Sequence, residues 1–173
     1  MLTHVNELTI VEMTKTIACG NHTLSLLYFV TLVLLGVSVV IDVDAELDGS
    51  SVDSVSRTED RIISHWRDVS ADEKSQLRDK VDEILRPLGY ETRLLVIDRA
   101  KSIALYFACL TLPAVMSLLD QWSSGQLRDI VETLFTFLAG TTRPVRVKRL
   151  IWTQTNYERT LKFFSSKQRK QAV

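Results

Sequence analysis

The sequence has few of the residues that build small cross-linked or metal-dependent domains. Its 173 residues include two cysteines, three histidines, three prolines and six glycines. Cys19 and Cys109 are ninety residues apart without a CxxC motif, so they indicate neither a disulfide framework nor a zinc site. His4, His22 and His65 are scattered, with no partner at the spacing of metal ligands. We therefore expect no metal site and no cofactor.

Signatures of catalysis are also missing. The chain contains no GxGxxG, GxxxxGK, HExxH or GxSxG string. Cys109 lies in an apolar stretch, where a small buried hydrophobic side chain is a better interpretation than a nucleophile. Asp44 to Gly49 imitates the first half of an EF-hand calcium loop, but the twelfth position is Val55 and not the bidentate Glu. We expect a protein without enzymatic activity.

The low content of glycine and proline also bears on the fold. Repeated hairpin signals are lacking, so the composition favours helices over a sheet of many short strands. We predict an all-α fold, in which an N-terminal transmembrane helix is followed by a small bundle of amphipathic and apolar helices.

The most prominent feature that the sequence does have is a long apolar run. Thr23 to Ile41 are nineteen residues without Asp, Glu, Lys, Arg or His. As a helix this run would be about 28 Å long, close to the hydrocarbon thickness of a bilayer. Thirteen of its residues are Leu, Ile, Phe or Val, which favour insertion. We predict a transmembrane helix or signal anchor at 23–41, in a membrane of the secretory pathway or of an organelle.

A second fate for this run stays open. The apolar core of a secretory signal has about 7 to 15 residues, fewer than this run, and this favours retention as an anchor. Val43 and Ala45, however, have the small or acceptable side chains that a signal peptidase site requires just beyond the run. The alternative prediction is cleavage after Ala45 and a secreted product.

Amphipathic patterns follow the apolar run. Apolar residues recur at helical spacing in residues 57–69, 70–88 and 126–139. Each apolar face needs a partner within the chain, in another subunit or at a membrane surface. We expect a protein partner, or self-association, through these amphipathic helices.

The stretch from Thr92 to Trp122 is interpreted as one long helix. Its middle, residues 103–119, is a second run without charged side chains. This run would be about 25 Å long as a helix, is less apolar than the first run and contains Pro113. A buried or re-entrant apolar helix at 103–119 is therefore favoured over a second membrane crossing.

Charge is sorted along the chain, although the formal net charge is zero. Residues 1–45 carry a net charge of −3, residues 46–100 of −4 and residues 101–173 of +7. The last part ends in a tail rich in basic and aromatic residues, a composition that is drawn to anionic lipid headgroups on the cytosolic side of a membrane. The predicted lipid-interaction residues are Arg143, Arg146, Lys148, Arg149, Trp152, Lys162, Lys167, Arg169 and Lys170.

Other interpretations of this tail remain. Arg146 to Arg149 resembles the R-x-K-R pattern that furin-like proprotein convertases cut, which implies processing after Arg149 in a lumenal chain. Nucleic acid is a further anionic partner, but it is the weaker alternative because no recognition module surrounds the tail. A terminal helix with ordinary surface charge also accounts for the composition.

Together these patterns predict five segments. They are an N-terminal flank at 1–22, the transmembrane helix or signal anchor at 23–41, an acidic linker at 42–56, a helical bundle at 57–141 and a basic C-terminal tail at 142–173. The function that fits them is a membrane-anchored α-helical interaction or scaffold protein whose basic tail contacts the lipid bilayer. The alternative is a secreted helical precursor, cleaved after Ala45 and Arg149, that acts as an extracellular ligand.

Overall fold

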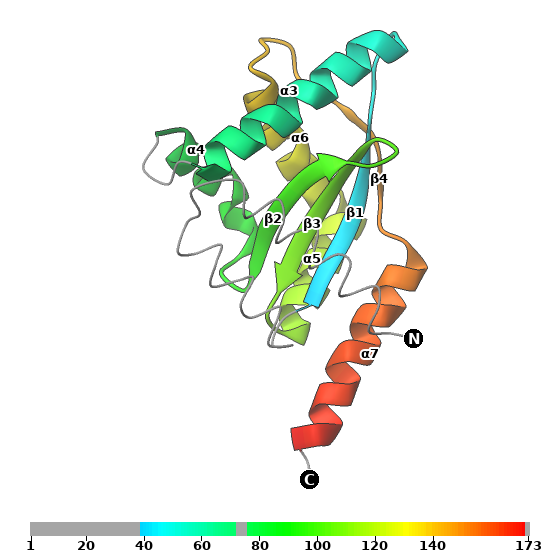
Figure 1. Ribbon diagram of the computed structural model, residues 1–173. Coiled ribbons are helices and arrows are strands. Elements are labelled where there is room, and N and C mark those ends of the chain that lie inside the picture. Colours follow the sequence, from blue (N-terminus) through cyan, green and yellow to red (C-terminus); the bar gives the residue numbers. More distant parts are fainter. Residues whose placement is uncertain (1–38, 72–75, 172–173) are drawn as a thin grey trace.

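The protein combines helices with one antiparallel sheet. The computed structural model describes residues 39–71 and 76–171. The elements are β1 (Val39–Leu47), α3 (Val52–Ala71), α4 (Gln76–Leu85), the 3-10 helix η1 (Arg86–Leu88), β2 (Thr92–Arg99), β3 (Ile103–Cys109), α5 (Leu112–Ser124), α6 (Gln126–Ala139), β4 (Val147–Ile151) and α7 (Gln154–Gln171). Because a four-stranded sheet organises this chain, the prediction of an all-α fold is wrong (Figure 1).

Strand β1 is the organising strand of the sheet. The strand order is β2-β3-β1-β4, and β1 pairs antiparallel with both β3 and β4. Strand β3 pairs with β1 over residues 39–45, whereas the short β4 pairs only with residues 44–47 of β1. The first half of β1 therefore has one edge that no strand occupies in the described part of the chain.

The position of β1 corrects the prediction of a transmembrane helix at 23–41. Residues 39–41 belong to this strand, and residues 23–38 lie outside the described residues. From Ile41 to Leu47 apolar residues alternate with acidic ones, and the apolar residues are buried. This period of two is that of a strand with one buried face, so the end of the apolar run and the start of the acidic linker form one strand.

The predicted long helix at Thr92 to Trp122 is also wrong. This stretch forms β2, β3 and α5, and the apolar run at 103–119 is divided between β3 and α5. Pro113 lies in the first turn of α5, where the missing backbone donor costs nothing, and the Thr111 side chain accepts a hydrogen bond from the backbone N–H of Ala114 at 3.2 Å. In the described residues, no helix combines the length and the apolar character needed to cross a membrane.

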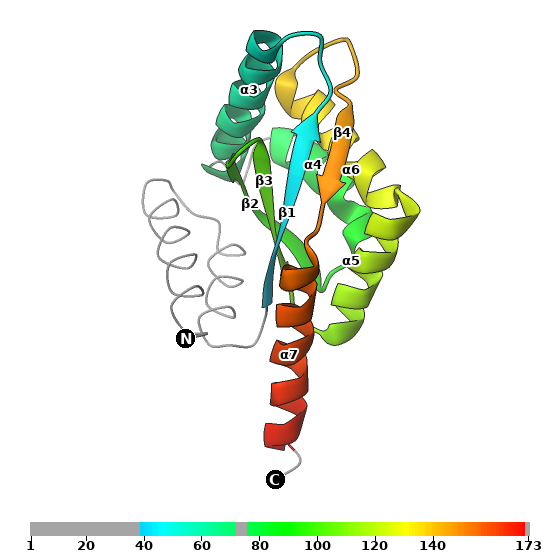
Figure 2. The same cartoon turned by 90° about the vertical axis from the view of Figure 1, so that its right-hand side faces the viewer.

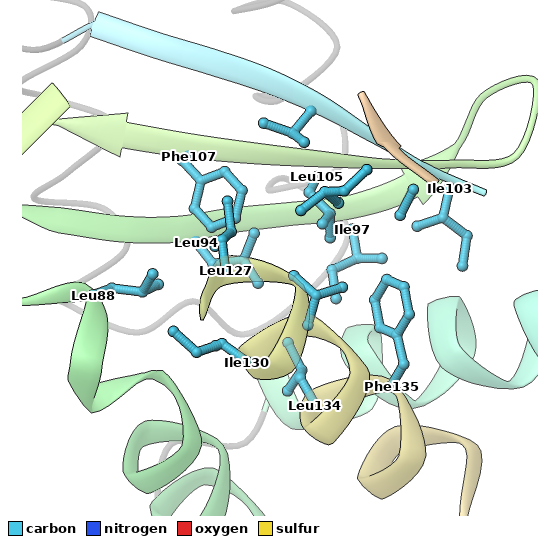
Figure 3. Close-up of a cluster of buried hydrophobic side chains, with 14 of the residues drawn as sticks. Leu88, Leu94, Ile97, Ile103, Leu105, Phe107, Leu127, Ile130, Leu134 and Phe135 are labelled. Carbon is cyan, nitrogen blue, oxygen red and sulfur yellow. The ribbon is translucent and has the colours of Figure 1, made fainter. Parts of the chain in front are cut away.

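The amphipathic helices find their apolar partner within the chain. Helices α3, α4 and α6 occur where the helical spacing predicts them, and α6 is capped by Gly140, whose φ of 62° favours glycine. Their apolar residues pack with one face of the sheet in a single core. Figure 3 shows Leu127, Ile130, Leu134 and Phe135 of α6 against strand residues such as Leu105 and Phe107. The predicted bundle at 57–141 is thus a layer of helices on a sheet.

The two faces of the sheet have different surroundings. Helices α5 and α6 lie on one side of the sheet, and we call this side the inner face (Figure 2). Its β3 residues, among them Leu105 and Phe107, are at most 1% exposed. The other side, which we call the outer face, carries Asp42, Asp44 and Glu46 of β1 together with a small apolar cluster described below.

One buried carboxylate fastens α3 to the turn between β2 and β3. The Glu59 side chain is 8% exposed and accepts hydrogen bonds from Arg99 Nη1 at 2.6 Å and from the Ser102 hydroxyl at 2.8 Å. Arg99 also pairs with the exposed Asp60. Because both oxygens of Glu59 are satisfied, burial of this charge is compensated by its partners.

Candidate basic interaction surface

Helix α7 is the last described element and begins beside the sheet. The Thr153 hydroxyl accepts a hydrogen bond from the backbone N–H of Asn156 at 3.4 Å, and the Thr153 carbonyl accepts one from the N–H of Tyr157 at 3.1 Å. Thr160 and Phe164, one turn apart, are 1% and 7% exposed. This buried stripe shows that α7 is packed on the domain and is not a free tail.

The start of α7 occupies the open edge of β1. Asn156 Nδ2 donates to the backbone carbonyl of Asp42 at 3.4 Å and to its carboxylate at 2.5 Å. The Arg159 guanidinium lies 3.5 Å from the same carboxylate. These contacts cover the strand edge where the pairing with β4 stops, and they fix the direction in which α7 leaves the sheet.

The second half of α7 gathers four of the predicted lipid-interaction residues. Lys162, Arg169 and Lys170 are exposed, and Lys167 is half-buried with its Nζ 5.6 Å from the centre of the Phe163 ring. No acidic residue follows Glu158 in the sequence. We call Lys162, Lys167, Arg169 and Lys170 the α7 cation cluster. In Figures 1 and 2 this half of the helix extends past the end of the sheet at which β1 begins.

The cations before α7 are in a different situation. Arg146 Nη1 lies 2.9 Å from Glu132, and Glu132 also accepts the backbone N–H of Val147 at 2.8 Å. Arg149 donates from Nε to Glu46 at 2.8 Å, and the Lys148 ammonium lies 3.5 Å from the same carboxylate. The Arg149 hydrogen bond is the main cause that lowers the pKa of Glu46. These three cations are therefore engaged in pairs that hold β4 on the domain.

The remaining two predicted lipid-interaction residues are also separate from the α7 cation cluster. Trp152 is 7% exposed and packs edge-to-face on Trp122 and Tyr157, with ring centroids 6.2 Å apart in both pairs. It is a core residue and cannot reach a lipid surface without unfolding. Arg143 is exposed in the loop before β4. Leu47, at the far end of β1, pairs with Val147, so this loop and the α7 cation cluster lie at opposite ends of the sheet.

An aromatic residue that the sequence did not single out lies at the same end of the sheet as the α7 cation cluster. The register places Val39 beside Cys109 and Cys109 beside Thr92, so the loop before β2 is at this end. Tyr90 in that loop is fully exposed. Its sequence signal is weak: the Pro87 to Tyr90 stretch indicates a turn, but not which end of a sheet the turn occupies.

Both predicted processing positions lie inside strands. Ala45 is 0% exposed in the second half of β1, and removal of residues 1–45 would take away seven of the nine residues of this strand. Arg149 lies in β4 and precedes the buried Leu150. Proteases need an extended, accessible segment, so cleavage of the folded protein at either position requires that the sheet first opens.

The described residues offer little for metal or thiol chemistry. They contain no group of three or more His, Cys, Asp or Glu side chains placed to hold a metal ion. Burial raises the pKa of the Cys109 thiol to about 12, with the Thr92 hydroxyl 3.7 Å from its sulfur. A thiol this weakly acidic is almost entirely protonated at neutral pH and is a poor nucleophile.

Comparison of the chain with known protein families, with curated proteins and with solved structures found no match.

Proposed function

We propose that this chain is an interaction protein without catalytic activity, which uses the α7 cation cluster to bind anionic lipid headgroups. The observation that carries the proposal is the contrast between two sets of cations. Arg146, Lys148 and Arg149 are paired with carboxylates of the domain. The second half of α7, in contrast, carries the exposed cations Lys162, Arg169 and Lys170 and no acidic residue.

The position of the cluster suits a flat, anionic surface. Helix α7 is held at its start by Asn156 and Arg159 and extends from the body of the domain (Figure 1). Its cations can therefore approach a membrane before the acidic part of the domain does. Tyr90, exposed at the same end of the sheet, adds an amphipathic ring of the kind that favours the interface.

The contribution of these cations to membrane affinity should be large enough to measure. A basic residue close to an anionic membrane contributes about 1 kcal/mol. Replacing Lys162, Arg169 and Lys170 by Gln should then weaken binding by about 3 kcal/mol, on the order of a hundredfold in affinity. Co-sedimentation of the full chain with phosphatidylserine-containing vesicles measures this affinity, and raising the salt concentration should weaken it because exposed charges are screened.

A charge-matched control separates position from net charge. Arg57, Arg61 and Lys101 are exposed cations of α3 and of the β2–β3 turn, away from α7. Replacing these three by Gln changes the net charge by the same amount and should leave vesicle binding nearly unchanged. Equal losses in both triple variants, or binding to neutral phosphatidylcholine vesicles that equals binding to anionic ones, would refute the proposal.

A further inference from the structure

The outer face of the sheet carries an apolar cluster of its own. Leu95 and Ala108 are its buried members, and Val40, Val96, Tyr106 and Leu110 are partly buried around them. All six residues belong to β1, β2 or β3 or directly follow β3. No described helical residue belongs to this cluster. It is therefore separate from the core on the inner face.

A β-bulge enlarges this cluster. Leu94 pairs with Phe107, but the next paired residue of β2 is Val96, which lies opposite Tyr106. Leu95 is thus the extra residue of the bulge. Leu94 and Ile97 belong to the core of the inner face, whereas Leu95 and Val96 both belong to the outer cluster. Regular alternation would place only one of these two neighbouring side chains on the outer face. The bulge therefore adds a second large apolar side chain to that face.

The two central members of this cluster are deeply buried. Leu95 is 3% exposed and Ala108 is 0% exposed, as low as many residues of the inner core. The outer face nevertheless lies on the side away from α5 and α6 (Figure 2). An apolar patch of this kind is normally covered by another part of the chain or by a partner.

We propose that residues 23–38 of the same chain cover this cluster. They directly precede Val39 and join β1 next to Val40, a member of the cluster that pairs with Ala108. They contain no Asp, Glu, Lys, Arg or His. The cover is therefore both apolar and attached at the edge of the patch, where its effective concentration far exceeds that of a free partner.

The dimensions of the cluster and of the segment agree. Three adjacent strands span about 10 Å, and the five residues from Tyr106 to Leu110 span about 14 Å along the strand. Sixteen residues reach about 24 Å even in a helix, the most compact regular form that a long segment adopts. The segment can therefore turn back after Ser38 and still lie across all three strands.

The charges of the outer face argue against lipid as the cover. Asp42, Asp44 and Glu46 share this face with the apolar cluster. A bilayer lying on the whole face would remove these carboxylates from water, which is costly. A segment that covers only the apolar end leaves these three carboxylates in their present surroundings. The run that the sequence alone assigns to a membrane thus has a place on its own domain.

Photocrosslinking of the full chain tests this proposal. Tyr106 is replaced by benzoylphenylalanine, which keeps an aromatic ring in the middle of the cluster, and Met116, 40% exposed on α5, carries the same probe as a control. Without vesicles, the probe at position 106 should give adducts that map to residues 23–38 of the same molecule, and the probe at 116 should not. A mixture of isotopically labelled and unlabelled chains distinguishes adducts within one chain from those between two copies.

A second pair of variants keeps the test decisive. Leu32, Val33, Leu34 and Leu35 are consecutive, so at least one of them faces the sheet whether the segment is a helix or a strand. Replacing all four by Asp should lower the adduct yield at position 106 tenfold or more, because a charge would be buried, whereas replacing them by Ala should largely preserve it. Adducts to a second copy, adducts to lipid when vesicles are added, or no adduct to residues 23–38 would each overturn the proposal. None of these outcomes bears on vesicle binding by α7, which the glutamine variants test separately.

Discussion

The two faces of the sheet differ in how their apolar residues are distributed. On the inner face, Ile41, Val43, Ala45 and Leu47 form an unbroken apolar row along β1 that packs in the core with the helices. On the outer face, the same strand carries Asp42, Asp44 and Glu46 after Val40. One strand therefore contributes to a uniform core on one side and to a divided surface, apolar at its start and acidic beyond, on the other.

This difference separates the part of the domain that the described elements close from the part that carries the proposed contacts. On the inner face, described helices pack against the strands and close the core. The outer cluster and the α7 cation cluster both lie toward the end of the sheet where β1 begins. The proposed interactions of the protein are thus concentrated at one end and on one face.

The largest expected effect is a direct test of the two faces. Leu105→Ala removes a side chain that is 0% exposed on the inner face and should lower the free energy of unfolding by about 2–5 kcal/mol. Val40→Ala, on the outer face, should cost about 0.5–1.5 kcal/mol because Val40 is only partly buried. Urea unfolding followed by circular dichroism measures both values. Equal costs would mean that the outer face is packed as tightly as the core.

The next effect concerns the buried carboxylate at the other end of the sheet. Glu59→Ala leaves Arg99 and the Ser102 hydroxyl without their acceptor and should lower the free energy of unfolding by about 1.5–3 kcal/mol. Asp60→Ala removes the exposed partner of the same arginine and should cost less than about 1 kcal/mol. The same urea titration separates the two variants. A larger loss for Asp60→Ala would show that Glu59 does not anchor α3.

The rate at which a cysteine thiol reacts compares the solvent accessibility of the two faces. In a Cys19→Ser background, Cys109 has a pKa of about 12, so about one thiol in ten thousand is ionised at pH 8. We therefore expect Cys109 to react with a disulfide reagent only when the protein unfolds. A cysteine at position 44 (D44C, together with Cys109→Ala) lies on the exposed outer face and should react at once. Rapid labelling of Cys109 in the native protein would contradict the burial described for the inner face.

The smallest expected effect is on the pH dependence of stability, through Asp44 on the outer face. Burial and the neighbouring Asp42 raise the pKa of Asp44, so ionisation of this carboxyl is less favourable in the folded chain than in the unfolded one. Its contribution makes the protein less stable as the pH rises from below the ordinary pKa of 3.8 through the folded value. Asp44→Asn should then stabilise the protein at pH 7, by no more than about 0.5 kcal/mol, and change nothing at pH 3. Unfolding midpoints at the two pH values test the sign.

The candidate surface could be predicted from the sequence in part. The excess of basic residues after residue 142 is visible as composition, and Lys162, Lys167, Arg169 and Lys170 do lie on one helix. Composition could not show that Arg146 and Arg149 are paired with Glu132 and Glu46, because Glu46 is a hundred residues away in the sequence. Tyr90 was missed for the same reason, since its neighbourhood is set by strand register.

What the sequence by itself determined are the local patterns: the helical spacing of α3, α4 and α6, the glycine that ends α6, and the sorting of charge along the chain. Only the tertiary structure decided whether Val39 to Ile41 and Ile103 to Cys109 form helices or strands. A short apolar run satisfies either conformation equally well, and its choice depends on hydrogen-bond partners far away in the sequence. Strand β1 finds these partners in β3 and β4, which begin more than fifty residues after it ends.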